Sequence, residues 1–212
     1  MSLDALLQTG SLWRAGSGNV RRRDSREGGV DSVPTGFAGL DALLAGGGWP
    51  VGTLTEILCP REDSRALSLV LPALARLSQQ HRWLAWVGPP HIPYAPALAA
   101  AGVDISRVLL VHPGDRSDAL WAVEQALRSG TCGAVLGWLE AGDHKTLRRL
   151  QLAAEAGHAW GILFRPARAA QQSSPAALRL QLAPTANGVD VHVLKRRGGW
   201  PTGPVQLDMD LG

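Results

Sequence analysis

The sequence predicts an α/β domain in which helices flank a mostly parallel central sheet and an antiparallel strand meander follows at the C-terminus. Short apolar runs alternate with stretches of helical spacing, which is typical of right-handed βαβ units. The C-terminal part instead alternates apolar and polar residues on both sides of Asn187-Gly188, a strong turn signal. With 212 residues, 45% hydrophobic and 18% charged, the chain is long and apolar enough for one packed domain.

The chain divides into a leader and this domain. Residues 1–32 combine a short amphipathic segment with a basic linker rich in Gly and Ser, which we expect to be flexible because it has little to bury. Residues 33–212 hold the periodic segments. We expect strands over 52–58, 83–87, 108–111, 134–139 and 161–164, and then 178–182, 189–193 and 205–209. Helices are expected over 67–77, 95–101, 117–130 and 143–157, with Ser117 and Asp143 as N-caps.

Composition narrows the class of protein. No apolar run approaches the roughly 20 residues that span a bilayer, and no export signal opens the chain, so a cytoplasmic protein is expected. The two cysteines lack metal-ligand spacing, and the dispersed histidines form no ligand pair. The net charge is +3, with basic clusters at 21–26, 145–149 and 195–197. Such clusters are compatible with direct DNA contact, but they are also common on solvated surfaces.

The loop after the first predicted strand raises the question of a nucleotide site. The run Thr55-Glu56-Ile57-Leu58 enters Cys59-Pro60-Arg61-Glu62-Asp63-Ser64-Arg65 and leaves through an apolar helix. A phosphate cradle at this place needs glycines, whose backbone N–H groups close around the anion. Here two carboxylates would face a polyanion, and each like-charge contact at about 4 Å costs on the order of 4 kcal/mol. The loop therefore opposes ATP binding.

The stretch VPTGFAGLDALLAGGGWPVGTLTEIL, residues 33–58, resembles the segment that leads into the nucleotide site of the RecA family. The similarity continues through residues 101–105, 128–130 and 191–197, and so covers roughly residues 33–209. The resemblance implies a RecA-like core with a degenerate P-loop. The glycines of that motif fall on Cys59 and Ser64, the phosphate lysine on Arg65, and the magnesium-binding hydroxyl on Ala66. Pro90 takes the place of the water-activating glutamate, and Trp138 that of the metal-binding acid. We therefore expect a non-enzymatic protein without cofactor, metal or catalytic residues.

Two bacterial, damage-inducible families with a degenerate fold of this kind are similar to the chain. Residues 69–90 and Gly137-Trp138-Leu139 resemble the SulA family, whose members bind FtsZ and block septation. The segments 11–14, 33–58 and 195–201 favour the ImuA family. The chain is identified as a member of ImuA, which implies an adaptor in SOS-induced translesion DNA synthesis that links RecA to the polymerase homologue ImuB. The alternative is a SulA-type division inhibitor, and a third class is a DNA-binding module.

Candidate partner-binding residues follow from exposure, charge and the ImuA resemblance. The amphipathic leader could form a helix that docks on a partner. The charged loop has no expected catalytic role, so a partner protein could bind it. The basic C-terminal run falls where RecA presents cations to its neighbour. These candidates are Leu6, Leu7, Trp13, Arg14, Arg61, Glu62, Asp63, Lys195, Arg196, Arg197 and Trp200. Among the other tryptophans, we expect Trp83, Trp86 and Trp160 in the core, and Trp49 at an interface.

Overall fold

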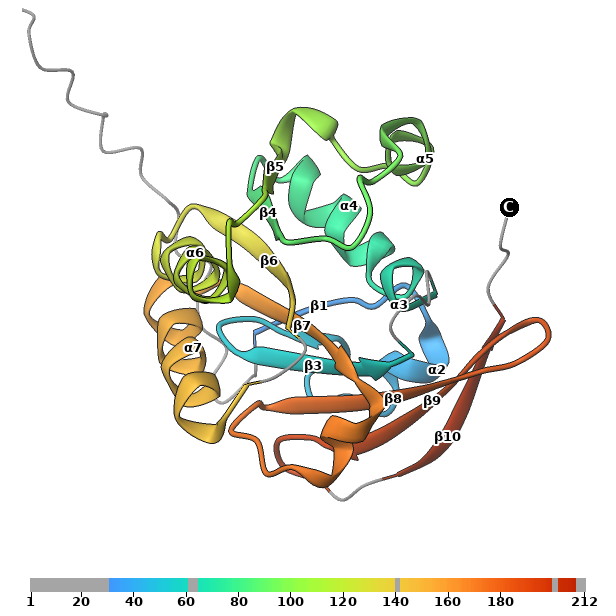
Figure 1. Cartoon of the computed structure of the whole chain (residues 1–212). Coiled ribbons are helices and arrows are strands. Elements are labelled where there is room, and N and C mark those ends of the chain that lie inside the picture. The colour runs from blue at the N-terminus through green and yellow to red at the C-terminus, as the bar shows by residue number, and fades with distance from the viewer. Residues whose placement is uncertain (1–30, 61–64, 140–141, 200–201, 209–212) are drawn as a thin grey trace, which may run out of the picture.

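The computed structural model describes residues 31–60, 65–139, 142–199 and 202–208, and within them one eight-stranded mixed sheet forms the centre of the molecule (Figure 1). Its strand order is β10-β9-β8-β3-β7-β6-β4-β5. Six strands pair in parallel: β3 (Leu54–Cys59), β4 (Trp83–Val87), β5 (Val108–Val111), β6 (Cys132–Trp138), β7 (Trp160–Pro166) and β8 (Leu178–Pro184). The strands β9 (Gly188–Lys195) and β10 (Thr202–Asp208) continue the sheet antiparallel. The short strands β1 (Ser32–Val33) and β2 (Trp49–Pro50) form a separate antiparallel pair.

The C-terminal strands are part of the central sheet. β8 pairs in parallel with β3 over Thr55–Leu58, so the first long strand lies between β7 and β8, two strands that come much later in the chain. The turn around Asn187-Gly188 then sets β9 against β8. The antiparallel strands therefore extend the same sheet on one side rather than forming a separate layer.

Helices cover both faces of the sheet. They are α2 (Ala38–Asp41), α3 (Arg65–Ser68), α4 (Leu71–Gln79), α5 (Ala95–Ala100), α6 (Arg116–Arg128) and α7 (His144–Gly157), with 3-10 turns η1 (Ile105–Arg107) and η2 (Ala167–Gln171). On one face, α4 buries Leu74 with Trp86 and Leu136. On the other, α6 and α7 bury their apolar sides against the neighbouring strand residues Ala85 and Val135. Alternate strand residues thus enter different cores, as the period of a β-strand requires.

The helix starts have local causes. Asp143 Oδ1 accepts a hydrogen bond from the backbone N–H of Thr146 (2.7 Å), so the predicted N-cap of α7 is confirmed. The predicted cap of α6 is wrong: Asp115, not Ser117, precedes the helix, and its carboxylate accepts from the N–H of Asp118 (2.8 Å). Pro72 lies in the first turn of α4, where its missing N–H is not needed.

Two tryptophan predictions are wrong. Trp49 is fully buried and stacks on Trp160 with 5.1 Å between ring centroids, so it belongs to the core rather than to an interface. Trp83 is 38% exposed because it opens β4 close to the end of the sheet. Trp86 and Trp160 are buried as expected. Among the described helices, none is long and apolar enough to cross a membrane.

Candidate functional site

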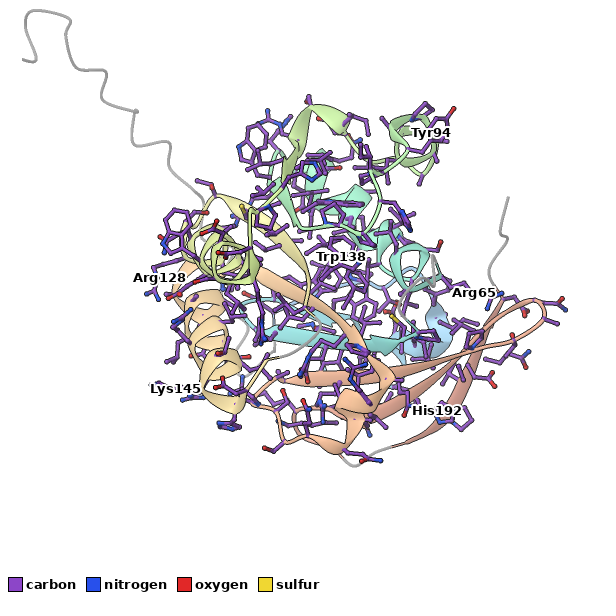
Figure 2. The ribbon with its side chains drawn as sticks, viewed as in Figure 1. Arg65, Tyr94, Arg128, Trp138, Lys145 and His192 are labelled. Carbon is purple, nitrogen blue, oxygen red and sulfur yellow. The ribbon has the colours of Figure 1, made fainter. Side chains whose placement is uncertain are left out.

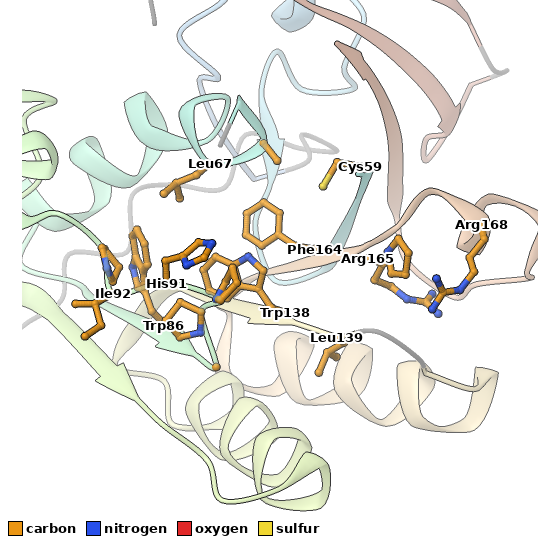
Figure 3. Close-up of a pocket in the computed structure, with 16 residues that line it drawn as sticks. Cys59, Leu67, Trp86, His91, Ile92, Trp138, Leu139, Phe164, Arg165 and Arg168 are labelled. Atoms are coloured by element: carbon orange, nitrogen blue, oxygen red, sulfur yellow. The ribbon is translucent and has the colours of Figure 1, made fainter. Parts of the chain in front are cut away.

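A pocket of about 400 Å³ opens at the carboxyl ends of the parallel strands (Figure 3). Cys59 ends β3, Trp138 ends β6, and Arg165 stands next to the end of β7. The loop after β4, residues 88–93, closes another side. Ligands of open α/β sheets bind at this edge because loops from several strands converge there. The pocket therefore occupies the place where the sequence led us to look for a lost nucleotide site.

The structure brings several of the predicted degenerate positions together. Cys59, Ala66, Pro90 and Trp138 all line the pocket. Arg65 is the first residue of α3 and is partly buried. Ser64 lies outside the described residues. Separate segments of the chain therefore meet at this edge of the sheet.

An aromatic row forms one wall of the pocket. The Trp86 and Trp138 rings are tilted by 39° with centroids 5.9 Å apart, and Trp138 stacks on Phe164 at 4.8 Å. The indole of Trp138 thus contacts both neighbouring rings, and Figure 2 shows it near the centre of the molecule. Within the described part of the chain, no cluster of three or more His, Cys, Asp or Glu side chains could hold a metal ion.

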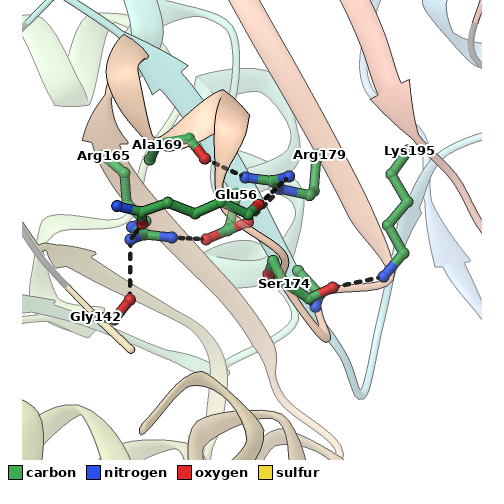
Figure 4. A network of polar contacts seen from close by, with 9 residues as sticks. Glu56, Gly142, Arg165, Ala169, Ser174, Arg179 and Lys195 are labelled. Atoms are coloured by element: carbon green, nitrogen blue, oxygen red, sulfur yellow. Dashed lines mark hydrogen bonds and ion pairs between the residues drawn. The ribbon is translucent and has the colours of Figure 1, made fainter. Parts of the chain in front are cut away.

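A buried ion-pair network lies beside the pocket (Figure 4). Glu56, fully buried in β3, pairs with Arg165 from β7 and with Arg179 from β8, whose Nε lies 2.6 Å from Glu56 Oε2. Backbone carbonyls accept further hydrogen bonds: Arg165 Nη2 donates to Gly142 O (3.2 Å) and Arg179 Nη2 to Ala169 O (2.7 Å). Two guanidinium groups share one carboxylate, so the network carries one surplus positive charge.

The predicted C-terminal cations lie close to this network or on the surface. Lys195 Nζ donates to Ser174 O (2.8 Å), and partial burial, together with the charge of Arg179, lowers the pKa of Lys195. Arg196 donates to the carbonyl of Leu43, and Arg197 is exposed. Lys195 and Arg196 therefore tie the end of β9 to neighbouring loops. The remaining candidates lie outside the described residues: Leu6, Leu7, Trp13, Arg14, Arg61, Glu62, Asp63 and Trp200.

Sequence reasoning missed an exposed apolar surface at the β5 end of the sheet. Of the eight large hydrophobic side chains that are exposed in the described part of the chain, seven lie between residues 83 and 121. We define the β5 surface as Trp83, Ile105, Arg107 and Leu109. The Arg107 guanidinium carbon stands 5.5 Å from the centre of the Trp83 ring. β5 is an apolar run, and such a run looks the same in sequence whether its strand is central or at an edge.

The chain is similar to proteins described as cell division inhibitor SulA. The family model "Cell division inhibitor SulA" matches residues 52–161. A SulA from Edwardsiella piscicida is 42% identical over 101 residues, which are 47% of this chain and 60% of that protein. A SulA from Serratia proteamaculans is 32% identical over 117 residues, 55% of this chain and 70% of that protein. The solved SulA from Pseudomonas aeruginosa is 31% identical, with a TM-score of 0.45, over 53% of this chain and 97% of that one.

These findings correct the main expectations. The ImuA identification is wrong, because the family model and the curated relatives are SulA. The role in translesion synthesis is wrong with it, and RecA and ImuB lose their support as partners. The RecA-like fold class is wrong as well: the sheet is mixed, and the family model that matches the chain is SulA.

The residues that suggested RecA have structural tasks here. The backbone N–H of Thr35 donates to Asp41 Oδ1 (2.8 Å), which joins the Thr-Gly pair to the helix that follows. Gly36 has φ +92°, and a Cβ there would lie 2.6 Å from Pro72 Cβ. Glu56 holds the two arginines of the buried network. A close contact at Gly36, a hydrogen bond between Thr35 and Asp41 and the buried ion pairs of Glu56 therefore account for these RecA-like residues without a nucleotide.

Proposed function

The chain belongs to the SulA family of cell division inhibitors, and from this membership we propose that it blocks septation by binding FtsZ through the β5 surface. The action would be stoichiometric and non-enzymatic and would take place in the cytoplasm, where FtsZ assembles. Residues 33–212 would act as one domain, preceded by the leader 1–32. The exposed apolar side chains at the end of the sheet are the observation that carries the choice of surface.

The β5 surface has the composition of a protein interface. Trp and Arg are the residues that most often dominate binding energy, and here Arg107 lies over the exposed ring of Trp83. Leu109 is 49% exposed in a strand that pairs only with β4 among the described strands. An apolar side chain in this position gains free energy when a partner removes it from water.

The position of the surface in the chain also supports the proposal. Every residue of the β5 surface lies within 52–161, the part matched by the family model. The predicted C-terminal candidates Lys195, Arg196 and Arg197 lie outside that part. A surface that serves the shared activity of a family belongs in its shared region. The C-terminal cations and Trp200 are therefore secondary candidates for the FtsZ contact.

The proposal is tested by sedimentation of FtsZ polymers with the purified chain and its variants. We expect the wild-type chain to lower the amount of sedimented FtsZ, and Leu109→Glu to weaken the effect at least about tenfold, because the variant buries a charge in the interface. The matched control is Leu152→Glu, since Leu152 is 46% exposed on α7. Its inhibition should equal that of the wild type.

Two results would count against the proposal in different ways. If the wild-type chain leaves FtsZ assembly unchanged at stoichiometric concentration, FtsZ is not the target. If Leu109→Glu and Leu152→Glu inhibit equally well, FtsZ is the target but the β5 surface is not the contact. Thermal unfolding of both variants checks that they are folded.

A further inference from the structure

We propose that the pocket at the carboxyl edge of the sheet binds a small planar aromatic carboxylate, with the rings against the Trp86–Trp138–Phe164 row and the carboxylate at Arg168. This ligand class goes beyond the proposed binding of FtsZ and does not depend on it.

The size and walls of the pocket suit a compact apolar body. A volume of about 400 Å³ lies in the range of small-molecule sites, roughly 300–1,000 Å³. Leu67 and Leu139 line the pocket together with the aromatic row, so its walls are mainly hydrophobic (Figure 3). The stacked and tilted rings present both faces and edges, which favours an aromatic ligand over a branched aliphatic one.

The charged side chains among the described lining residues of the pocket are cationic. Arg165 and Arg168 line it, and none of the other described lining residues carries a carboxylate. The carboxylate of Glu56 contacts Arg165, but it is also paired with Arg179 and belongs to the buried network beside the pocket. Arg168 is exposed at the pocket, so its guanidinium can donate charge-assisted hydrogen bonds to a ligand carboxylate (Figure 3).

The buried network beside the pocket adds to the preference for an anion. Its two guanidinium groups share the single carboxylate of Glu56, so the network carries one surplus positive charge. This charge attracts a ligand anion. The opposite ligand, an aromatic ammonium ion, would meet this field with the wrong sign. The positive charge therefore favours a carboxylate on the ligand, while the aromatic row favours aromatic rings.

The test compares three probes of the same shape in calorimetric titrations without FtsZ: 1-naphthoate, 1-naphthalenemethanol and 1-naphthylmethylammonium. We expect 1-naphthoate to bind about tenfold more tightly than the alcohol, because one charge-assisted contact changes affinity by that order. The ammonium probe should bind most weakly. Arg168→Gln should reduce the preference for the carboxylate to less than about threefold. The control Arg148→Gln changes an exposed arginine on α7 and should keep the full preference.

A second variant tests where the aromatic rings of the ligand bind. Leu67→Trp adds volume to the lining and should abolish binding of all three probes, provided that near-ultraviolet circular dichroism shows a folded protein. The proposal is overturned if the wild type binds no probe below 1 mM, if it binds all three equally, or if Arg168→Gln retains the preference for 1-naphthoate. The last result would place the carboxylate elsewhere, and the second would leave only a non-selective apolar cavity.

Discussion

Glu56 links the strands at the centre of the sheet. It faces Arg179 across the β3–β8 pair and contacts Arg165 from β7, so one carboxylate joins three strands. Because Glu56 is fully buried and both guanidinium groups are nearly so, no water can replace it. Its loss would leave two buried positive charges close together.

We therefore expect Glu56→Gln to lower the free energy of unfolding by about 3–5 kcal/mol, the usual cost of breaking a buried pair from one side. The comparison is Glu124→Gln, where Glu124 on α6 pairs with Arg128 (3.1 Å) and Arg149 (2.8 Å). Both of these arginines are more than half exposed, so the loss should be about 0–1 kcal/mol. Urea denaturation measures both values. Equal losses would show that burial of the Glu56 network adds nothing.

For single residues, the sequence predicted the chemical character of a side chain better than its burial. Residue type alone excludes a general base at Pro90 and a metal-binding acid at Trp138, and both residues line the pocket. The burial of Trp49 and the exposure of Trp83 could not be predicted from the sequence. Trp49 neighbours Pro50 and glycines, which suggested a loop, yet Trp160 from a distant segment covers it. Burial of this kind depends on contacts that only the complete fold supplies.

At the scale of elements, α6 and α7 pack more closely than their apolar stripes indicate. A Cβ on Gly157, at the end of α7, would lie 1.9 Å from the carbonyl oxygen of Leu127 on α6. That oxygen belongs to helix backbone and cannot move aside cheaply. The glycine thus sets the distance between the two helices at this crossing.

Gly157→Ala should accordingly destabilise the protein by about 1–3 kcal/mol or more, as overpacking does in a filled core. Gly203→Ala is the control, because a Cβ there meets nothing within 4 Å. Thermal unfolding of the two variants should show a clear fall in Tm for the first and almost none for the second. If both retain the wild-type Tm, the helices can separate without cost.

The start of α7 should make stability sensitive to acid. The hydrogen bonds from Thr146 lower the pKa of the Asp143 carboxyl below its ordinary value. A carboxyl with a lowered pKa in the folded state stabilises the fold above the pKa of the unfolded chain, and this contribution is lost as the pH falls through the lowered value. Asp143→Asn keeps an oxygen that can cap the helix but does not titrate.

We expect the urea midpoint of Asp143→Asn to fall less between neutral and acid pH than that of the wild type. Asp118→Asn serves as the comparison, because Asp118 lies in the first turn of α6, where Asp115 and not Asp118 is the N-cap. Parallel pH profiles for wild type and Asp143→Asn would refute the assignment of this acid sensitivity to the cap.

Most elements could be predicted because each has a strong local signal. Period-two and period-3.6 patterns place the strands and helices, and Asp143 has both the right residue type and the right position for a cap. The order of the strands has no such signal. β3 pairs with β7 and β8 although residues 60–159 separate it from the nearer of them in sequence. The same limit hid the β5 surface, since an edge is a property of the whole sheet.

At the scale of the whole molecule, the sheet should open from its ends. β3 and β7 have partners on both sides and side chains in both cores, whereas β5 and β10 are the end strands of the described sheet. Amides of β3 and β7 should therefore exchange with deuterium only on global unfolding, and those of β5 and β10 much earlier. Native-state hydrogen exchange under varied urea measures this order. Uniform exchange across the sheet would contradict it.

The position of β3 also matters while the protein is being made. A ribosome adds about 5–20 residues per second, so β3 waits on the order of ten seconds until β8 leaves the exit tunnel. Until β7 emerges, shortly before β8, a strand whose six residues are all buried in the finished sheet has neither of its final neighbours. The yield of this protein in a cell should therefore depend on chaperone supply and translation speed as well as on the stability of the completed fold.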